Sequence, residues 1–244
     1  MKKNIIYYEG AVFGNWQLLK LLSVNRTNRR WLIKNIKTHE EKPMFQSNLP
    51  KLIVNEMNKL ARQIKKHWPG FITEVNSRIK QGGSFGGYSL KEYFEDTQTQ
   101  EKTKFLSPFI SKVFFNYFKD KVGIEKQDVK GSDLLWLSFD IEQKLSLAHN
   151  TKSWTGNGFK KVGFHILMKF NMDEAQDFMI KESFICMIHL DICKSSWTNR
   201  DKTSNFSTLN LKKEDYGKII VAHGDLKPCR TKLEKNLSPI LKPV

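Results

Sequence analysis

The sequence predicts a mixed α/β (α+β) fold in which a central mixed β-sheet is flanked by helices. Two observations lead to this prediction. Residues 52–66 and 105–123 carry apolar side chains at helical spacing. From residue 124 on, the chain divides into short apolar or alternating segments between polar and glycine-bearing turns, which is typical of strands. The length of 244 residues suits one large domain or two small ones.

The N-terminal region, residues 1–100, is expected to be rich in helix. Short apolar runs over 5–37, on either side of the basic turn 25–30, are interpreted as strands of a small hairpin. Helices are expected next, over 52–66 and again over 70–80. The apolar positions of the first helix are Ile53, Met57, Leu60 and Ile64.

A soft boundary is expected near residue 100, after the glycine-rich loop QGGSFGGYS and the polar stretch EDTQTQEKTK. The chain would then divide into an N-terminal part, residues 1–100, and a functional core, residues 101–244. A single continuous domain is the alternative. The core begins with a helix over 105–123 that ends at Gly123. Strands are expected at IEKQDV, SDLLWLSF, DIEQKLSLA, VGFHILMKFN, SFICMIHLDI and KIIVAHG.

The charge is the first indication of function. Lys and Arg number 41 against 25 acidic residues, which gives a formal net charge of +16. Such an excess on an ordinary globular composition indicates a polyanionic partner, most commonly nucleic acid. A membrane surface is disfavoured because no basic amphipathic helix stands apart. Charge alone does not separate a nuclease from a protein that only binds DNA.

Several other classes of protein are not expected. No apolar run is long enough for a transmembrane helix, and Glu9 interrupts the N-terminus too early for a signal peptide, so we expect a cytoplasmic protein. The three cysteines lack CxxC spacing, and the six histidines lack HxH or HExxH spacing. No phosphate-binding loop of the Walker type occurs, so no nucleotide cofactor is expected.

The segment KGSDLLWLSFDIEQKLSL carries the residues expected to do chemistry. Asp133 begins one predicted strand, and Glu142 and Lys144 lie two residues apart on the next, so their side chains share a face. Asp140 lies on that face too. A hairpin between the two strands would bring Asp133 toward Glu142. Two carboxylates and a lysine that converge can hold a hard metal ion and assist hydrolysis of a phosphodiester.

These residues resemble the PD-(D/E)xK nuclease superfamily, in particular type II restriction endonucleases. Gly131-Ser132-Asp133 stands in place of the family's Pro-Asp, and Glu142-Gln143-Lys144 fits its second half. The resemblance implies a restriction-endonuclease-like arrangement over about residues 105–195. The part at 101–244 is then expected to be the catalytic core, and residues 1–100 a DNA-recognition or dimerisation part. It implies Asp133, Glu142 and the Gln143 backbone carbonyl as ligands of Mg²⁺, for which Mn²⁺ can substitute, and Lys144 as the residue that orients or activates water. It also implies a bacterial homodimer and a palindromic site on double-stranded DNA.

Chance matches to the motif are the main alternative, because (Asp/Glu)-x-Lys occurs four times in this lysine-rich chain. Glu40 to Lys42 lies in a polar loop, and Asp128 to Lys130 precedes a glycine turn. Asp225 to Lys227, with Asp215 upstream, is a rival set, although Pro228 would end its strand. If Glu142 and Lys144 belong only to a solvated strand face, the protein binds DNA without cutting it. A repair or recombination nuclease with the same core is a third reading.

Two loops are expected to contact DNA, because they combine lysines, hydroxyls and amides near strand ends. One follows the catalytic strand at 149–161 and the other lies at 194–202; the turn at 25–30 and the loop at 82–88 are secondary candidates. The residues expected at the DNA are Lys152, Ser153, Trp154, Thr155, Asn157, Lys160, Lys161, Lys194, Ser195, Ser196, Asn199 and Arg200.

Overall fold

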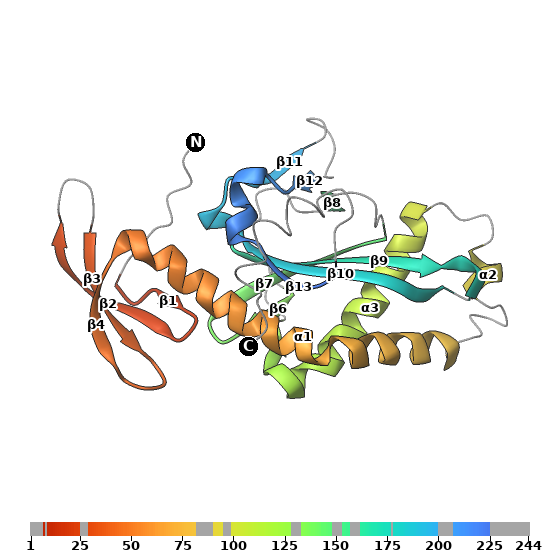
Figure 1. Ribbon diagram of the computed structural model, residues 1–244, viewed down its shortest axis with the longest axis horizontal. Coiled ribbons are helices and arrows are strands. Elements are labelled where there is room, and N and C mark those ends of the chain that lie inside the picture. Colours follow the sequence, from red (N-terminus) through yellow and green to blue (C-terminus); the bar gives the residue numbers. More distant parts are fainter. Residues whose placement is uncertain are drawn as a thin grey trace.

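The computed structural model is a mixed α+β protein built in layers. It describes residues 7, 9–24, 29–81, 90–94, 99–127, 133–147, 153–156, 162–176, 178–199 and 207–224. A small N-terminal sheet lies at one end, and a long helix leads from it along one face of a central sheet (Figure 1). A second small sheet lies against the other face of the central sheet.

The N-terminal sheet has four antiparallel strands in chain order. They are β1 (Val12–Phe13), β2 (Trp16–Val24), β3 (Arg29–Asn35) and β4 (Glu41–Phe45). Its own core contains Trp16, Leu18, Trp31 and Ile33, which lie on one side of the sheet and pack against Leu49. The hairpin expected within 5–37 is confirmed, but the N-terminal region becomes helical only after this sheet.

One continuous helix, α1 (Leu49–Gln81), replaces the two helices expected over 52–66 and 70–80. Pro69 lies between the two expected helices, but the buried stripe continues through Trp68, Phe71 and Val75. Burial of this stripe outweighs the lost hydrogen bond at Pro69. Gly70 leaves room for the hydroxyl of Tyr117 on α3 (Thr99–Val122), which a Cβ at this position would displace.

The remaining helices are the short α2 (Leu90–Tyr93), α3 (Thr99–Val122) and four 3-10 turns. The helix expected over 105–123 is confirmed, and Gly123 ends it with a φ of 71°, a left-handed conformation that favours glycine. The 3-10 turns are η1 (Gln46–Asn48), η2 (Glu174–Gln176), η3 (Leu190–Ile192) and η4 (Lys213–Lys218).

The central sheet has six strands in the order β13-β10-β9-β7-β6-β5. Strands β7 and β9 are parallel and the other neighbours are antiparallel, so the expected mixed sheet is confirmed. The strands are β5 (Ile124–Lys126), β6 (Leu134–Trp136), β7 (Phe139–Ser146), β9 (Phe164–Asp173), β10 (Met179–His189) and β13 (Ile220–His223).

The three-stranded sheet on the opposite face has the order β11-β12-β8. Its strands are β8 (Ser153–Gly156), β11 (Trp197–Asn199) and β12 (Ser207–Asn210). Trp154 and Trp197 both pair with Leu209, from opposite sides. Strands β8 and β11, which lie within the similar sequences KSWTGN and KSSWTN, are therefore the two outer strands of one small sheet, and their tryptophans face the second hydrophobic core.

The boundary expected near residue 100 does not separate two cores. Helices α1 and α3 lie in the same large cluster of buried residues, which also includes strands of the central sheet. Within the described part of the chain, no helix has the length and apolar character needed to cross a membrane.

Candidate active site

The β6–β7 hairpin brings Asp133 next to Glu142. Leu134 pairs with Ile141, and the backbone N–H of Asp133 donates to the carbonyl of Ile141 at 3.0 Å. Asp133 therefore lies opposite Glu142, as the sequence predicted. The exposed Asp133 carboxylate accepts a hydrogen bond of 2.8 Å from the backbone N–H of Gln143. This bond fixes the carboxylate directly beside the middle residue of the Glu-x-Lys segment.

Glu142 and Lys144 project from the face of β7 that is turned away from the helices, because side chains alternate along a strand. The neighbours Ile141 and Leu145 point into the large core under α1 and α3. The Nζ of Lys144 lies 2.5 Å from Oε1 of Glu142. The Glu142 side chain is 4% exposed and that of Lys144 is 18% exposed, so the carboxylate is nearly buried and the ammonium still reaches solvent.

The donor set suits Mg²⁺ better than an ion that needs a full protein cage. Mg²⁺ is commonly held by one or two carboxylates, with water and substrate phosphate completing its shell. Asp133 and Glu142 supply two hard oxygen groups on one face, and the exposed Asp140 follows on the same face of β7. Among the described residues, no group of three or more His, Cys, Asp or Glu side chains is arranged to hold a metal.

Gln143 points the other way, as expected for the middle residue of the motif. Its side chain is buried on the helix side of the sheet, and its Nε2 has no hydrogen-bond partner among the described residues. Any role of Gln143 at the site is therefore limited to its backbone, whose N–H already holds Asp133.

His165 is a neighbour of the site that sequence reasoning did not place there. It pairs with Glu142 across the parallel strands β7 and β9. Trp197 Nε1 donates to His165 Nε2 at 3.1 Å, and His165 Nδ1 lies 3.2 Å from the carbonyl oxygen of Gly163. Since Nε2 accepts, Nδ1 carries the proton and the ring is neutral. Burial lowers the pKa of His165 to about 4, although the Gly163 carbonyl and Glu142 act in the opposite direction.

The first expected DNA-binding loop contains a strand. Trp154, in β8, is fully buried, and its Nε1 donates to the carbonyl of Met168 at 2.9 Å. Its assignment to the DNA-contacting set was wrong, because the side chain belongs to the core. Ser153 is half-buried, while Thr155 is exposed. Lys152, Asn157, Lys160 and Lys161 lie outside the described residues.

The second expected loop is tied down by a buried aspartate. Both the N–H and the hydroxyl of Ser195 donate to Asp215 at 2.6 Å, and the N–H of Lys194 donates to Asp215 at 2.8 Å. Ser195 is buried and cannot contact DNA, so this assignment was also wrong. The side chain of Lys194 is exposed and Ser196 is half-buried. Asn199 ends β11, while Arg200 lies outside the described residues.

The same contacts bear on the rival set Asp215, Asp225 and Lys227. Asp215 is fully buried and its two oxygens accept hydrogen bonds from residues 194 and 195, so it organises this loop. Asp225 and Lys227 lie outside the described residues, as do the turn at 25–28, the loop at 82–88 and the motif match at 128–130.

The small sheet brings the two expected DNA-contacting segments together. Thr155 of β8 and Thr198 of β11 both pair with Thr208 of the middle strand β12. Both outer threonines are exposed, because the neighbouring tryptophans point inward. Sequence reasoning missed this row of threonines, since it treated the segments as two similar but separate polar loops.

Comparisons with protein-family models, with curated proteins and with solved structures give no match.

Proposed function

We propose that the protein is a metal-dependent DNA endonuclease with a PD-(D/E)xK-like active site. The observation that carries the proposal is the convergence of Asp133, Glu142 and Lys144 on one face of the β6–β7 hairpin. A chance match to the motif would not be expected to lie opposite a second acidic residue on a paired strand. The net charge of +16 supports a nucleic-acid substrate.

The order of elements also supports the proposal. Helix α3 is followed by the antiparallel strands β5, β6 and β7 and, after β8 of the small sheet, by β9, which runs parallel to β7. The acid precedes the second strand of this meander and the Glu-x-Lys segment lies on the third. This arrangement agrees with the one that the nuclease resemblance implies, and on that basis we propose a restriction-endonuclease-like core.

Asp133, Glu142 and the backbone carbonyl of Gln143 would hold Mg²⁺, with Mn²⁺ as a substitute. When bound, the ion would polarise the scissile phosphate and favour loss of a proton from water. Near-burial of Glu142 keeps bulk water from competing for its carboxylate, and the backbone N–H of Gln143 limits the rotation of Asp133. Both effects lower the cost of assembling the site on the DNA.

Lys144 would hold the attacking water and offset the negative charge that develops on the phosphate. Its ammonium lies on the same face as both carboxylates and is partly exposed, so a phosphate can approach it. In the reaction, the water oxygen bonds to phosphorus, the bond from phosphorus to the leaving oxygen breaks, and the leaving oxygen takes up a proton. Without DNA, the contact between Lys144 and Glu142 keeps both charges satisfied.

More specifically, we propose that the protein is a type II restriction endonuclease. We propose a homodimer that cuts a palindromic site in double-stranded DNA in the bacterial cytoplasm, since two-fold symmetry presents two equivalent sites to two strands. The exposed residues Thr155, Thr198 and Lys194 carry groups suited to DNA contact, and the Thr198 hydroxyl also donates to the Thr208 carbonyl at 3.1 Å.

Binding of DNA without cleavage is the second candidate function. The 2.5 Å contact between Lys144 and Glu142 favours it, because each charge is satisfied within the protein and needs no ligand. In that case the hairpin is structural and only the basic surface is functional.

Incubation of the purified protein with plasmid DNA and Mg²⁺ separates these functions. Discrete fragments are expected from a site-specific endonuclease. A smear would point to an unspecific nuclease, and intact plasmid with a mobility shift would establish the binding-only function and contradict the proposal.

A further inference from the structure

The β2–β3 ribbon of the N-terminal sheet contributes no residue to the proposed active site. Strand β2 runs for nine residues from the junction with the core, roughly 30 Å at the usual rise of a strand. Its last three residues and the first two of β3 are all exposed. The buried residues of this sheet lie nearer the junction, so the outer end of the ribbon contributes nothing to the small core.

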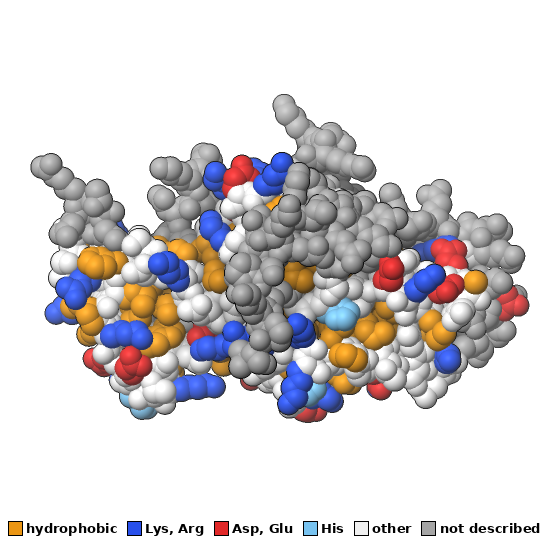
Figure 2. All heavy atoms as spheres, in the orientation of Figure 1, with side chains coloured by type: hydrophobic (Ala, Val, Ile, Leu, Met, Phe, Trp, Pro, Cys, Tyr) orange, Lys and Arg blue, Asp and Glu red, His pale blue; other side chains and the backbone are white. Residues whose placement is uncertain are grey.

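The outer end of the ribbon combines cations with apolar side chains. Arg29 pairs with Val24 and Arg30 pairs with Ser23, at the last positions of the ladder. Leu22 and Val24 are 44% and 63% exposed. Figure 2 shows hydrophobic and basic side chains side by side over this end of the molecule.

The basic residues of the outer ribbon differ in their ion pairing from the lysines nearer the junction. Lys34 and Lys42 form ion pairs with Glu41 and Glu40 at 3.7 and 3.2 Å. Neither Arg29 nor Arg30 forms an ion pair with a described carboxylate; Arg30 lies 5.7 Å from the ring of Phe45, which steadies its guanidinium without neutralising it. Arg29 and Arg30 therefore present positive charge that no described carboxylate pairs, while the Glu9 carboxylate accepts a hydrogen bond from the N–H of Leu21 at 3.4 Å.

We propose that the outer β2–β3 ribbon is a DNA-binding arm that grips phosphates on both sides of a groove. A two-stranded β-ribbon fits the major groove of B-DNA. Neighbouring residues on a strand project to opposite faces, so Arg29 and Arg30 can reach opposite walls of the groove. Leu22 and Val24 would contact sugars and base edges. This inference rests on the proposed DNA substrate and adds a second contact region to it.

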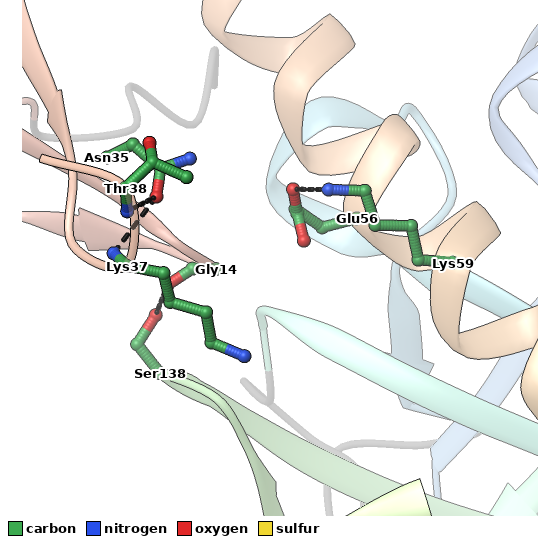
Figure 3. Close-up of polar contacts among 7 residues, drawn as sticks. All are labelled: Gly14, Asn35, Lys37, Thr38, Glu56, Lys59 and Ser138. Atoms are coloured by element: carbon green, nitrogen blue, oxygen red, sulfur yellow. Dashed lines mark hydrogen bonds and ion pairs between the residues drawn. The ribbon is translucent and has the colours of Figure 1, made fainter. Parts of the chain in front are cut away.

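The arm is fixed to the catalytic hairpin through a chain of turns. The N–H of Ile36 in the β3–β4 turn donates to the Asn15 carbonyl at 2.7 Å, and the Ser138 hydroxyl in the β6–β7 turn donates to the Gly14 carbonyl at 3.0 Å. Figure 3 shows this junction, where Asn35 also accepts hydrogen bonds from the N–H groups of Lys37 and Thr38. DNA held by the arm would thus lie at a set position relative to Asp133 and Glu142.

The test compares Arg29→Ala/Arg30→Ala with the matched control Arg62→Ala/Lys66→Ala, which removes the same charge from exposed positions of α1. Binding to a 30-base-pair duplex is measured by fluorescence anisotropy in EDTA, over a series of salt concentrations. The arm variant should lose about tenfold or more in affinity, and its dependence of log Kd on log salt should be flatter by about 2. The control should remain within about threefold of the wild type.

A charge-preserving variant, Arg29→Lys/Arg30→Lys, should retain most of the affinity, since phosphate contacts need the charge. Circular dichroism and thermal melts establish that each variant is folded. Equal losses of DNA affinity in the arm and control variants would contradict the proposed arm. A lysine variant that binds DNA as weakly as the alanine variant would contradict it too. A wild type that binds duplex but does not cut it contradicts the nuclease and leaves the arm intact, so the two failures are distinguishable.

Discussion

Glu142 and His165 are paired across the parallel strands β7 and β9, so the nearly buried carboxylate has a neutral imidazole as its neighbour. The hydrogen bond from Trp197 fixes the tautomer of His165 and leaves the ring no acceptor on that side. His189, on β10, is also buried, with its Nδ1 3.8 Å from Asp191 Oδ2. Burial lowers the pKa of His189 to about 4, and Asp191 opposes this shift.

These two histidines predict a loss of stability on mild acidification. Each has a folded-state pKa of about 4, below the ordinary value of 6.5. Above pH 6.5 they are neutral in both states, so their full contribution is present. Between pH 6.5 and 4 the unfolded chain binds protons that the folded protein does not, and the free energy of unfolding falls by up to ~3 kcal/mol for each histidine.

Urea denaturation at several pH values between 7 and 4 measures this effect. The variant His165→Gln keeps an acceptor for Trp197 but does not titrate, so its stability should depend on pH about half as steeply. A wild type whose stability does not change between pH 6.5 and 4.5 would show that neither histidine is neutral for the reason given.

The junction between the N-terminal sheet and the core predicts that replacing two of its glycines with alanine destabilises the protein to different extents. Gly10 and Gly14 both have positive φ, of 89° and 63°. A Cβ on Gly10 meets nothing, while one on Gly14 would lie 2.6 Å from Cγ of Glu56 and 3.0 Å from the Phe139 ring. Gly10→Ala should cost about 1–2 kcal/mol from the backbone alone, and Gly14→Ala should cost a further ~1–3 kcal/mol from overpacking.

Thermal or urea unfolding of the two variants compares the costs directly. Equal destabilisation would mean that the Gly14 turn does not dock on α1 and β7 as described. The comparison isolates the packing contribution because the backbone contribution is present in both variants.

The proposed metal site predicts a specific ion dependence. Cleavage should proceed with Mg²⁺ or Mn²⁺, stop in EDTA, and be slow or absent with Ca²⁺, whose looser geometry positions water poorly. Agarose-gel assays of plasmid cleavage with each ion measure this. Undiminished cutting in EDTA would eliminate the metal mechanism.

The two segments that we propose contact DNA predict two kinds of variant, one that loses discrimination between DNA sequences and one that loses affinity for all DNA. Asn199→Ala should reduce discrimination against a site with one altered base pair by ~1–3 kcal/mol if the amide contacts a base. Lys194→Ala should instead weaken cognate and altered sites alike and flatten the salt dependence. Binding curves on matched duplexes distinguish the two. If Asn199→Ala weakens all DNA equally, recognition lies elsewhere in the protein.

Local patterns in the sequence predicted much of this fold. The alternation along the expected strand at 140–148 placed Glu142 and Lys144 on one face, and pairing with the expected strand at 132–139 predicted that Asp133 lies near Glu142. The apolar stripe of α1 was also evident, although Pro69 and Gly70 concealed that the helix is continuous.

The sequence patterns did not predict which strands pair when they are far apart in the chain. Nothing local indicates that His165 pairs with Glu142, or that the two Trp-Thr segments flank one strand. Trp154 and Ser195 were misassigned for the same reason, since polar neighbours suggested exposed loops while the partners that bury them come from distant segments.

The most direct test of the proposed active site is the single-turnover cleavage rate of Lys144→Met, Glu142→Gln and Asp133→Asn with Mg²⁺, with DNA affinity measured in parallel. Each should cut at least ~100-fold more slowly than the wild type, by analogy with loss of other charge-stabilising groups, while binding DNA within a few-fold of it. The double variant Glu142→Gln/Lys144→Met, which leaves no unpaired buried charge, separates lost chemistry from lost folding. Glu125→Gln, at an exposed position on β5, should cut normally. Cleavage by folded Lys144→Met at the wild-type rate would contradict the assignment of this hairpin as the active site.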